Sequence, residues 1–426
     1  MEQSQQSIQL MDNVLASQVA AGEVVERPAS VIKELVENSI DAGARTIRVE
    51  IQRGGSLLMR VTDDGCGMSR QDASMSLLRH ATSKLRSFED LFNIQQMGFR
   101  GEAIPSIASV SHFSILTRRE QDIEGTLLRV DAGIAQEPQS AGCARGTVIE
   151  VRELFYNTPV RRKFLKSAET EAAHIQHQVS LHALCYPQIR FVLTIDGTNE
   201  LDTAATKDLR QRIAELKGRD IAQKLIQMSP GEAPGVSVSG YLMPLAEAKR
   251  NRKMQYIFLN GRPIEDKMVL RAVRDGYGGL PTGLHPALFL YLQVEPGLVD
   301  INVHPAKKEV RFRRIADVCT AIMDAIAASL RNYAKQQQTS SSTPPTLGIP
   351  QPRHQANTAS PTPAAAPVAP ASSALRLRPL HPSEREHQQQ LPIQAPYPVP
   401  AAQPISPKKT HHPIPQDSID SRETEL

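Results

Sequence analysis

Residues 31–44, with the sequence VIKELVENSIDAGA, carry acidic and amide groups at a spacing suited to chemistry on a phosphate. Wound as a helix at about 100° per residue, this segment places its aliphatic residues on one side and these polar residues on the other: Glu34, Glu37, Asn38 and Asp41. A carboxylate at Glu34 could activate water, while the Asn38 amide oxygen could ligate Mg²⁺, which commonly takes only one or two protein ligands. The alternative is the solvated face of an ordinary amphipathic helix.

Residues 63–67, with the sequence DDGCG, end an alternating strand and could bind a flat base. The Asp63 carboxylate could accept a hydrogen bond from an exocyclic amine, and Gly65 and Gly67 would let the backbone approach the ring. The alternative is an ordinary strand-ending turn.

Two further stretches could contact phosphate. Residues 98–103, GFRGEA, precede a predicted helix whose first amides could cradle a phosphate, and residues 79–84, RHATSK, could close over it. Lys307 follows a His-Pro turn and could project from a second domain. A generic glycine-rich loop and a lone surface lysine are the alternatives. The pattern G-x-x-x-x-G-K-[ST] is absent, so a Walker-type phosphate loop is excluded.

The elements that must position these groups predict an α+β protein. In residues 13–215, alternation predicts strands at 46–52, 57–65, 112–119, 125–131 and 146–154, and a helix at 73–82. In residues 216–335, the pattern predicts strands at 256–263, 287–295 and 299–312, and helices at 266–278 and 315–333. The strand–helix–strand order indicates a small α/β domain with a crossover connection.

The rest of the chain has the composition of a disordered segment. Residues 341–426 hold more than half of the 31 prolines and a single aromatic residue, so they cannot bury enough apolar surface to offset their chain entropy. We therefore expect a first domain in 1–215, a second domain in 216–335 and a disordered linker in 336–426.

Composition also limits the environment and partners. The four cysteines are scattered without a C-x-x-C pair, which argues against a metal site and fits a reducing cytosol. No apolar run approaches about 20 residues and the start is no signal peptide, so we expect a soluble cytoplasmic protein without a membrane partner. The net charge of +4 permits nucleic-acid binding without demanding it.

Six stretches of residues 10–335 resemble the MutL family of DNA mismatch repair proteins: ELVENSIDAG, DDGCG, RHATSK, GFRGEA, LFYNTPVRRKF and NVHPAK. The first two are common to the wider superfamily of gyrase, large heat-shock chaperone and histidine kinase ATPases. The last three are specific to the MutL branch. The resemblance implies a two-layer α/β sandwich with a mixed, Bergerat-type sheet, followed by a smaller, ribosomal-S5-like transducer domain.

The resemblance implies ATP and Mg²⁺ as ligands and assigns roles to residues. Glu34 would be the general base and Asn38 the Mg²⁺ ligand, while Lys307 would reach the γ-phosphate and sense the nucleotide. Asp63 would read the adenine amine in a pocket shaped by Gly65, Gly67 and Thr147. The lid and its flanks would supply the remaining contacts: Thr82, Ser83, Lys84, Gly98, Phe99, Arg100, Gly101 and Glu102. Asp64 departs from the commoner D-N-G but does not occupy the adenine-reading position.

The resemblance also implies partners: a MutS-type mismatch sensor, DNA, and a downstream helicase or endonuclease, with a nucleoid-associated location. ATP would pair two copies through residues 1–30, although packing of this arm on its own domain is an alternative. Non-specific contacts to DNA phosphates are assigned to Arg161, Arg162, Lys163, Arg262, Lys267, Arg271 and Arg274. A solvated helix of mixed charge is the alternative for the last three.

Two rival functions differ in their requirements. The first rival is another ATPase of the same superfamily, a histidine kinase or a chaperone ATPase. A histidine kinase needs a phosphoacceptor hairpin ahead of the ATP motif, and we expect no room for it here. A non-catalytic ATP-switched scaffold does not need Glu34. We find no D-Q-H-A-type stretch for an endonuclease. The family normally adds a C-terminal dimerisation domain, and because the sequence ends in linker-like composition, a fragment and a split gene product both fit.

Overall fold

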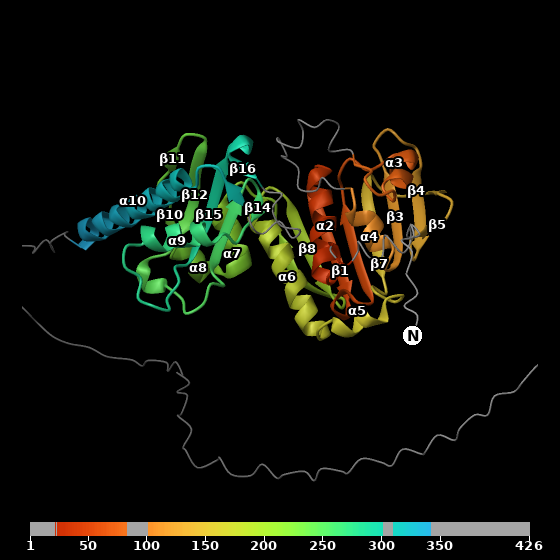
Figure 1. The fold of residues 1–426 in the computed structure, drawn as a ribbon, viewed down its shortest axis with the longest axis horizontal. Helices are drawn as coiled ribbons and strands as arrows, with labels where there is room; N and C mark the ends of the chain where they lie inside the picture. The colour runs from red at the N-terminus through yellow and green to blue at the C-terminus, as the bar shows by residue number, and fades with distance from the viewer. Residues whose placement is uncertain (1–21, 23, 83–100, 301–309, 342–426) are drawn as a thin grey trace, which may run out of the picture. The chain divides into compact units, whose positions relative to one another are not determined.

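The fold is described from a computed structural model, which places residues 22, 24–82, 101–300 and 310–341 (Figure 1). Most of the predicted linker, from residue 342 onward, lies outside the described residues, as do residues 1–21 of the predicted dimer-contact arm. The first part of that linker, from 336 to 341, is the end of a helix.

A mixed sheet forms the first domain. Its strands are β1 (Thr46–Gln52), β2 (Leu58–Asp63), β3 (His112–Arg118), β4 (Gly125–Asp131), β5 (Ile134–Ala135), β6 (Gln139–Ala141), β7 (Gly146–Arg152), β8 (Arg190–Ile195) and β9 (Thr198–Thr203). Within the described residues their order is β5-β4-β3-β7-β2-β1-β8-β9, and β6 pairs with β4. Among the described strands of this sheet, only the β1–β8 pair is parallel. The strands β1, β3 and β4 alternate between buried and more exposed residues, as expected for a sheet covered on one face.

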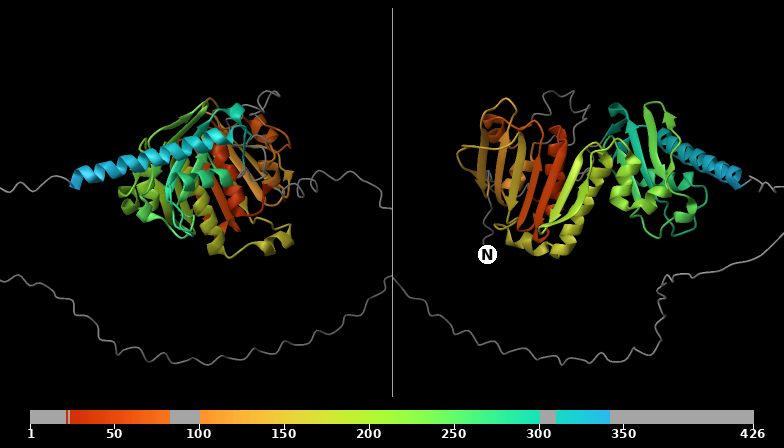
Figure 2. Two further views of the ribbon diagram at one scale, coloured as in Figure 1. Left: turned by 60° about the vertical axis from the view of Figure 1, so that its left-hand side comes forward. Right: turned by 180° about the vertical axis from the view of Figure 1, so that it is seen from behind.

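Helices α2 (Pro28–Asp41), α4 (Ala103–Ala108) and α6 (Ala168–Cys185) cover that face (Figures 1 and 2). Helix α2 begins where Arg27 is extended and Pro28 occupies the first turn, which needs no amide hydrogen there. It ends at Asp41, two residues before a glycine with positive φ, Gly43. Two short helices, α3 (Arg70–Met75) and α5 (Pro159–Phe164), lie outside this layer.

A second mixed sheet lies between two helical layers. Its strands are β10 (Ile226–Gln227), β11 (Gly231–Ala233), β12 (Val236–Leu242), β13 (Gln255–Leu259), β14 (Arg262–Pro263) and β15 (Leu288–Val294). Strands β13 and β15 are parallel and are joined through α9 (Lys267–Gly276), which confirms the predicted crossover. Helices α9 and α10 (Ile315–Ser341) pack on one face, while α7 (Leu209–Lys217) and α8 (Arg219–Gln223) pack on the other. Burial on both faces explains why residues 287–292 are uniformly apolar.

The structure confirms the predicted α+β class and mixed sheet but corrects several elements. The predicted helix 73–82 is wrong, because Ser69 caps α3 earlier and the helix ends at Met75. The predicted strand 256–263 is two strands joined by a turn at Asn260 and Gly261, both with positive φ. The predicted strand 299–312 contains β16 (Val299–Asp300) and β17 (Arg311–Phe312), and residues 301–309 lie outside the described part.

Two helices extend beyond the limits that the sequence suggested. Helix α10 continues eight residues past the predicted end at 333, to 341. Helix α7 runs through the expected domain boundary at 215. No helix among the described residues is long and apolar enough to cross a membrane.

Arg212 of α7 joins the end of α6 to the first sheet. Its side chain is fully buried, and its guanidinium donates hydrogen bonds to the carbonyl oxygens of Ala183, Pro187, Ile189 and Ala204 at 2.6–3.0 Å. Burial lowers the pKa of Arg212, although Glu215 opposes this shift. One side chain therefore satisfies four carbonyl groups from three separate segments of chain.

Replacing this arginine should destabilise the protein strongly. Arg212→Met removes a donor from four carbonyl groups, two of them in the buried residues Ala183 and Ile189, and we expect a loss of about 3 kcal/mol in the free energy of unfolding. Urea denaturation followed by circular dichroism measures this loss, with the exposed Arg219→Met as the matched control. Equal stability of the two variants would contradict the proposed role of Arg212.

Candidate active site

Helix α2 places Glu34 and Asn38 at the boundary between core and solvent. Val31, Ile32 and Leu35 are buried in the first core, whereas the Glu34 side chain is 19% exposed and Asn38 is half-buried. Both polar groups are therefore accessible yet partly shielded, an environment in which charge interactions are stronger than in bulk water.

The environment of Glu37 differs from the polar helix face that its helical angle predicted. Its side chain is only 4% exposed and its carboxylate faces α6, where His182 Nε2 lies 3.7 Å from Glu37 Oε1. The other ring nitrogen of His182 is 2.8 Å from the carbonyl oxygen of Gln178. The predicted grouping of Glu37 with the polar side is wrong, because α6 covers that part of α2.

Lys33 connects the buried carboxylate to the partly exposed one. Its Nζ atom lies 2.8 Å from Glu34 Oε1 and 3.1 Å from Glu37 Oε1. Burial would lower the pKa of Lys33, but Glu37 and Glu34 outweigh it and leave the pKa raised. Lys33 thus stays charged and orients Glu34, a role that sequence reasoning did not assign.

The Asp63 carboxylate is held at the end of β2 by two hydrogen bonds. Its Oδ1 accepts from the Gly65 amide and its Oδ2 accepts from the Ser39 hydroxyl, both at 2.9 Å. Burial raises the pKa of Asp63, and the bonds from Gly65 and Ser39 only partly offset this. Each carboxylate oxygen has a second lone pair, so the group can accept a further donor.

The glycines of this turn are required by neighbouring backbone. A Cβ atom on Gly67, which has a φ of +68°, would lie 2.2 Å from the Arg118 carbonyl oxygen, and one on Gly65 would lie 2.9 Å from Ala42. The sequence predicted that these glycines let the backbone approach a nucleotide base. In the structure they already let it approach other parts of the protein's own chain.

Asp64 has a structural role. Its Oδ1 accepts from the backbone amides of Arg45 and Thr46, at 2.6 and 2.9 Å, where β1 begins. An asparagine has an oxygen at the same position, so D-D-G and D-N-G can both make these bonds.

Thr147 lies beside this turn at the start of β7, opposite Asp63 in the β2–β7 ladder. It is buried, and its Oγ1 is 3.0 Å from Thr117 Oγ1. Thr117 in turn accepts from the Met68 amide at 2.9 Å. Sequence reasoning missed Thr117 and Ser39. Ser39 stands inside the ELVENSIDAG stretch and could have been found there, whereas Thr117 carries no local signal.

The two flanks of the predicted lid lie together. Glu102 Oε1 is 3.9 Å from Arg79 Nη2 and 3.5 Å from His80 Nδ1, and a Cβ on Gly101 would lie 2.4 Å from the Ala81 carbonyl oxygen. Thr82 is half-buried at the edge of this contact. The other predicted lid residues and the predicted sensor lie outside the described residues: Ser83, Lys84, Gly98, Phe99, Arg100 and Lys307.

The basic residues predicted to contact DNA divide into exposed and buried groups. These five are exposed: Arg162 and Lys163 on α5, and Lys267, Arg271 and Arg274 on α9. Arg271 pairs with Asp275 at 3.6 Å. Arg161 is half-buried. Arg262 is only 6% exposed, so its prediction as a DNA contact is wrong, because a buried guanidinium cannot reach a phosphate at the surface.

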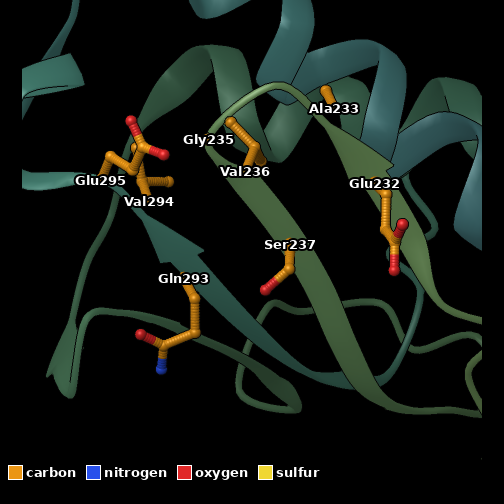
Figure 3. Close-up of a pocket in the computed structure, with 8 residues that line it drawn as sticks. All are labelled: Glu232, Ala233, Gly235, Val236, Ser237, Gln293, Val294 and Glu295. Carbon is orange, nitrogen blue, oxygen red and sulfur yellow. The ribbon is translucent and has the colours of Figure 1, made fainter.

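Two other observations restrict where ligands could bind. The described residues contain no group of three or more His, Cys, Asp or Glu side chains able to hold a metal by themselves. An open pocket on the second sheet is lined by residues of β11, β12 and β15, including Glu232 and Glu295 (Figure 3). It shares no residue with the Glu34–Asp63 region, and its two carboxylates would repel phosphate.

The comparisons with family models agree with this arrangement. Residues 26–145 match the model described as "Histidine kinase-, DNA gyrase B-, and HSP90-like ATPase". Residues 213–331 match "DNA mismatch repair protein, C-terminal domain". A crystal structure of the N-terminal domain of a DNA repair protein superposes with a TM-score of 0.63 at 24% identity, covering 76% of this chain and 99% of that one. The fold and site thus define an ATPase domain of the gyrase, HSP90 and histidine kinase class.

Individual relatives identify the branch of this class. A MutL protein of Akkermansia muciniphila is 58% identical over 380 residues, which are 86% of this chain and 60% of that protein. One of Syntrophotalea carbinolica is 45% identical over 336 residues, 79% of this chain and 53% of that protein. The chain belongs to the MutL family of DNA mismatch repair proteins. It spans between half and two thirds of the length of these curated relatives.

The contribution of Asp64 as a hydrogen-bond acceptor can be tested separately from the contribution of its negative charge. Asp64→Ala removes the bonds to the Arg45 and Thr46 amides and should cost about 1 kcal/mol in the free energy of unfolding, because water replaces them only in part at this exposed site. Asp64→Asn keeps the oxygen and should stay within about 0.5 kcal/mol of the parent. Urea denaturation measures both. An asparagine variant as unstable as the alanine variant would show that the charge matters instead.

Proposed function

We propose that the first domain binds ATP with Mg²⁺ and hydrolyses it slowly. The observation that carries the proposal is the hydrogen bond from Ser39 of α2 to Asp63 of β2. Ser39 follows Asn38 directly in α2. This bond therefore holds the Asp63 carboxylate, which suits adenine, next to the polar edge of α2, which suits phosphates. The family membership supports the same assignment.

Asp63 is the residue we assign to adenine. Its carboxylate is partly shielded and its pKa is raised by burial, so a further hydrogen-bond donor would stabilise its ionised form. The exocyclic amine of adenine is such a donor. Thr147, opposite Asp63 in the ladder, would form the back of the pocket together with Gly65 and Gly67.

Asn38 and Glu34 are the residues we assign to the triphosphate end. Asn38 would supply an amide oxygen to Mg²⁺, whose other ligands are phosphate oxygens and water when the nucleotide is bound. The absence of a cluster of metal ligands in the described residues is compatible with this, since Mg²⁺ needs few protein ligands. Glu34 would accept the proton of the attacking water at its carboxylate.

Substitutions should separate binding from turnover. Glu34→Ala should lower ATP turnover at least about 100-fold, because the general base is lost, and should leave nucleotide affinity nearly unchanged. Asp63→Ala should weaken binding at least about tenfold, because a charged hydrogen bond is lost. Phosphate release measures turnover, and titration with a fluorescent ATP analogue measures affinity.

The control for both variants is Asp64→Asn, which should leave both quantities unchanged. Thermal unfolding verifies that each variant is folded. Equal loss of affinity and turnover in Glu34→Ala would assign that residue a merely structural role.

A second candidate function is a scaffold that ATP switches without productive turnover. The Lys33–Glu34 ion pair at 2.8 Å favours it, because a carboxylate held by an ammonium group has one oxygen already engaged and unavailable to a water molecule. Parent turnover no higher than that of Glu34→Ala would favour the scaffold.

We propose the wider role on the strength of the family alone. We propose domains at 1–215 and 216–335 and a linker at 336–426, as first expected. Nucleotide contacts would come from Lys307, Thr82–Lys84 and Gly98–Glu102, as the family resemblance implies. The chain would pair with a second copy when ATP binds, contact DNA phosphates, and link a MutS-type mismatch sensor to a downstream helicase or endonuclease. We assign no endonuclease activity to this polypeptide.

Nucleotide-dependent pairing can be measured directly. With a non-hydrolysable ATP analogue the chain should elute as a dimer, and with ADP as a monomer, because the γ-phosphate is the group that differs. Size-exclusion chromatography with light scattering gives the mass. Asp63→Ala should remain monomeric when the analogue concentration is below the raised dissociation constant of this variant. The same mass with both nucleotides would contradict this mechanism.

A further inference from the structure

Residues 249–253 of the second domain, with the sequence KRNRK, form a surface loop that we call the basic loop. It connects the short 3₁₀ helix η3 (Leu245–Glu247) to β13. All five residues are exposed, and four of them carry a positive charge. None of them is among the basic residues that the sequence analysis assigned to DNA.

The backbone of the basic loop is fixed by hydrogen bonds. Lys249 and His285 exchange two backbone bonds, of 2.8 and 2.7 Å. The Gln255 amide donates to the Arg252 carbonyl oxygen at 3.0 Å, and the Lys253 amide donates to Asn251 Oδ1 at 3.1 Å. The cations therefore project from a backbone that is held in place, which lowers the entropy cost of binding a partner.

The basic loop lacks the counter-charges found elsewhere on the surface. Several exposed or half-exposed arginines pair closely with carboxylates, among them Arg119 with Asp122 and Arg190 with Asp202, both at 2.8 Å. Among the residues that the structure describes, Lys249 is the one cation of the loop with such a partner. That partner is Glu247 at 3.5 Å, which also binds Lys224 at 2.7 Å. Within the described part of the chain, Arg250, Arg252 and Lys253 form no ion pair.

The positive surface extends from the basic loop to helix α9. Burial lowers the pKa of His285, and the nearby charges of Arg252 and Arg274 lower it further. The backbone of Lys249 in the loop is bonded to that of His285, and the charges of Arg252 in the loop and Arg274 on α9 both act on this imidazole. Asp275, next to Arg274, is engaged with Arg271.

We propose that the basic loop, together with Arg274, binds the phosphate backbone of duplex DNA. The unpaired charges of Arg250, Arg252 and Lys253 match a polyanion, because each phosphate contact releases a condensed counterion. An acidic protein partner is less suited, because the loop has no exposed aromatic or large aliphatic side chain to form the core of an interface. The inference rests on the proposed DNA-binding role and adds a surface to it.

The test compares two variants of equal charge change in the full chain. The loop variant is Arg250→Gln/Arg252→Gln/Lys253→Gln. The control variant is Arg48→Gln/Arg129→Gln/Lys207→Gln, which removes three exposed cations from the first domain. Fluorescence anisotropy with a labelled duplex, at several salt concentrations, gives the affinity and its salt dependence.

The loop variant should bind at least about tenfold more weakly near 0.1 M salt, and the slope of log affinity against log salt should shrink by about 2–3, close to 0.9 per lost contact. The control variant should match the parent. The charge-keeping variant Arg250→Lys/Arg252→Lys should retain most of the affinity, and unchanged thermal unfolding excludes misfolding.

Several results would overturn the proposal. If the loop variant had the same DNA affinity and the same salt slope as the parent, the loop would be excluded as a DNA contact, while the proposed DNA binding by the rest of the chain would stand. Equal loss in the loop and control variants would show only a general charge effect. Loss of poly-glutamate binding with DNA binding unchanged would assign the loop to an acidic protein. A parent chain that binds no duplex would refute the DNA-binding role and the loop with it.

Discussion

The structure depends on how helix α2 buries a carboxylate in the core of the first domain. Glu37 is 4% exposed, and an isolated buried carboxylate is costly unless it is paired. Lys33 supplies the charge and also binds Glu34, while His182 approaches from α6. Because one cation serves both carboxylates, the packing of α2 against α6 is coupled directly to the position of Glu34.

A second constraint acts at the end of β2, where several backbones meet. A side chain on Gly67 or Gly146 would collide with the carbonyl oxygens of Arg118 or Asp63, at 2.2 and 2.0 Å. Asp64 holds the start of β1 and Asp63 holds Ser39 of α2. The turn therefore fastens strands and helix together while leaving Asp63 able to accept another donor. The same compactness that stabilises the sheet also shapes the candidate site.

The contacts from α6 continue into the second domain. The Tyr186 hydroxyl donates to the Gly261 carbonyl oxygen at 3.0 Å, and the Tyr291 hydroxyl donates to that of Leu184 at 2.8 Å. His182 lies on the same helix and contacts Glu37. A packed helix thus runs from the neighbourhood of Glu34 to the second sheet, providing a physical connection through which the two domains could influence each other.

The sequence by itself determined the features that depend on local pattern: helix α2, the strand that ends at Asp63, the β13–α9–β15 crossover and the family. These follow from hydrophobic periodicity and turn chemistry, which neighbouring residues encode. Only the tertiary structure decided that Glu37 and Arg262 are buried, that Ser39 holds Asp63, and that Arg250, Arg252 and Lys253 form no ion pair with the described residues. Helical angle cannot reveal what a distant segment covers, because burial and charge pairing depend on residues remote in sequence.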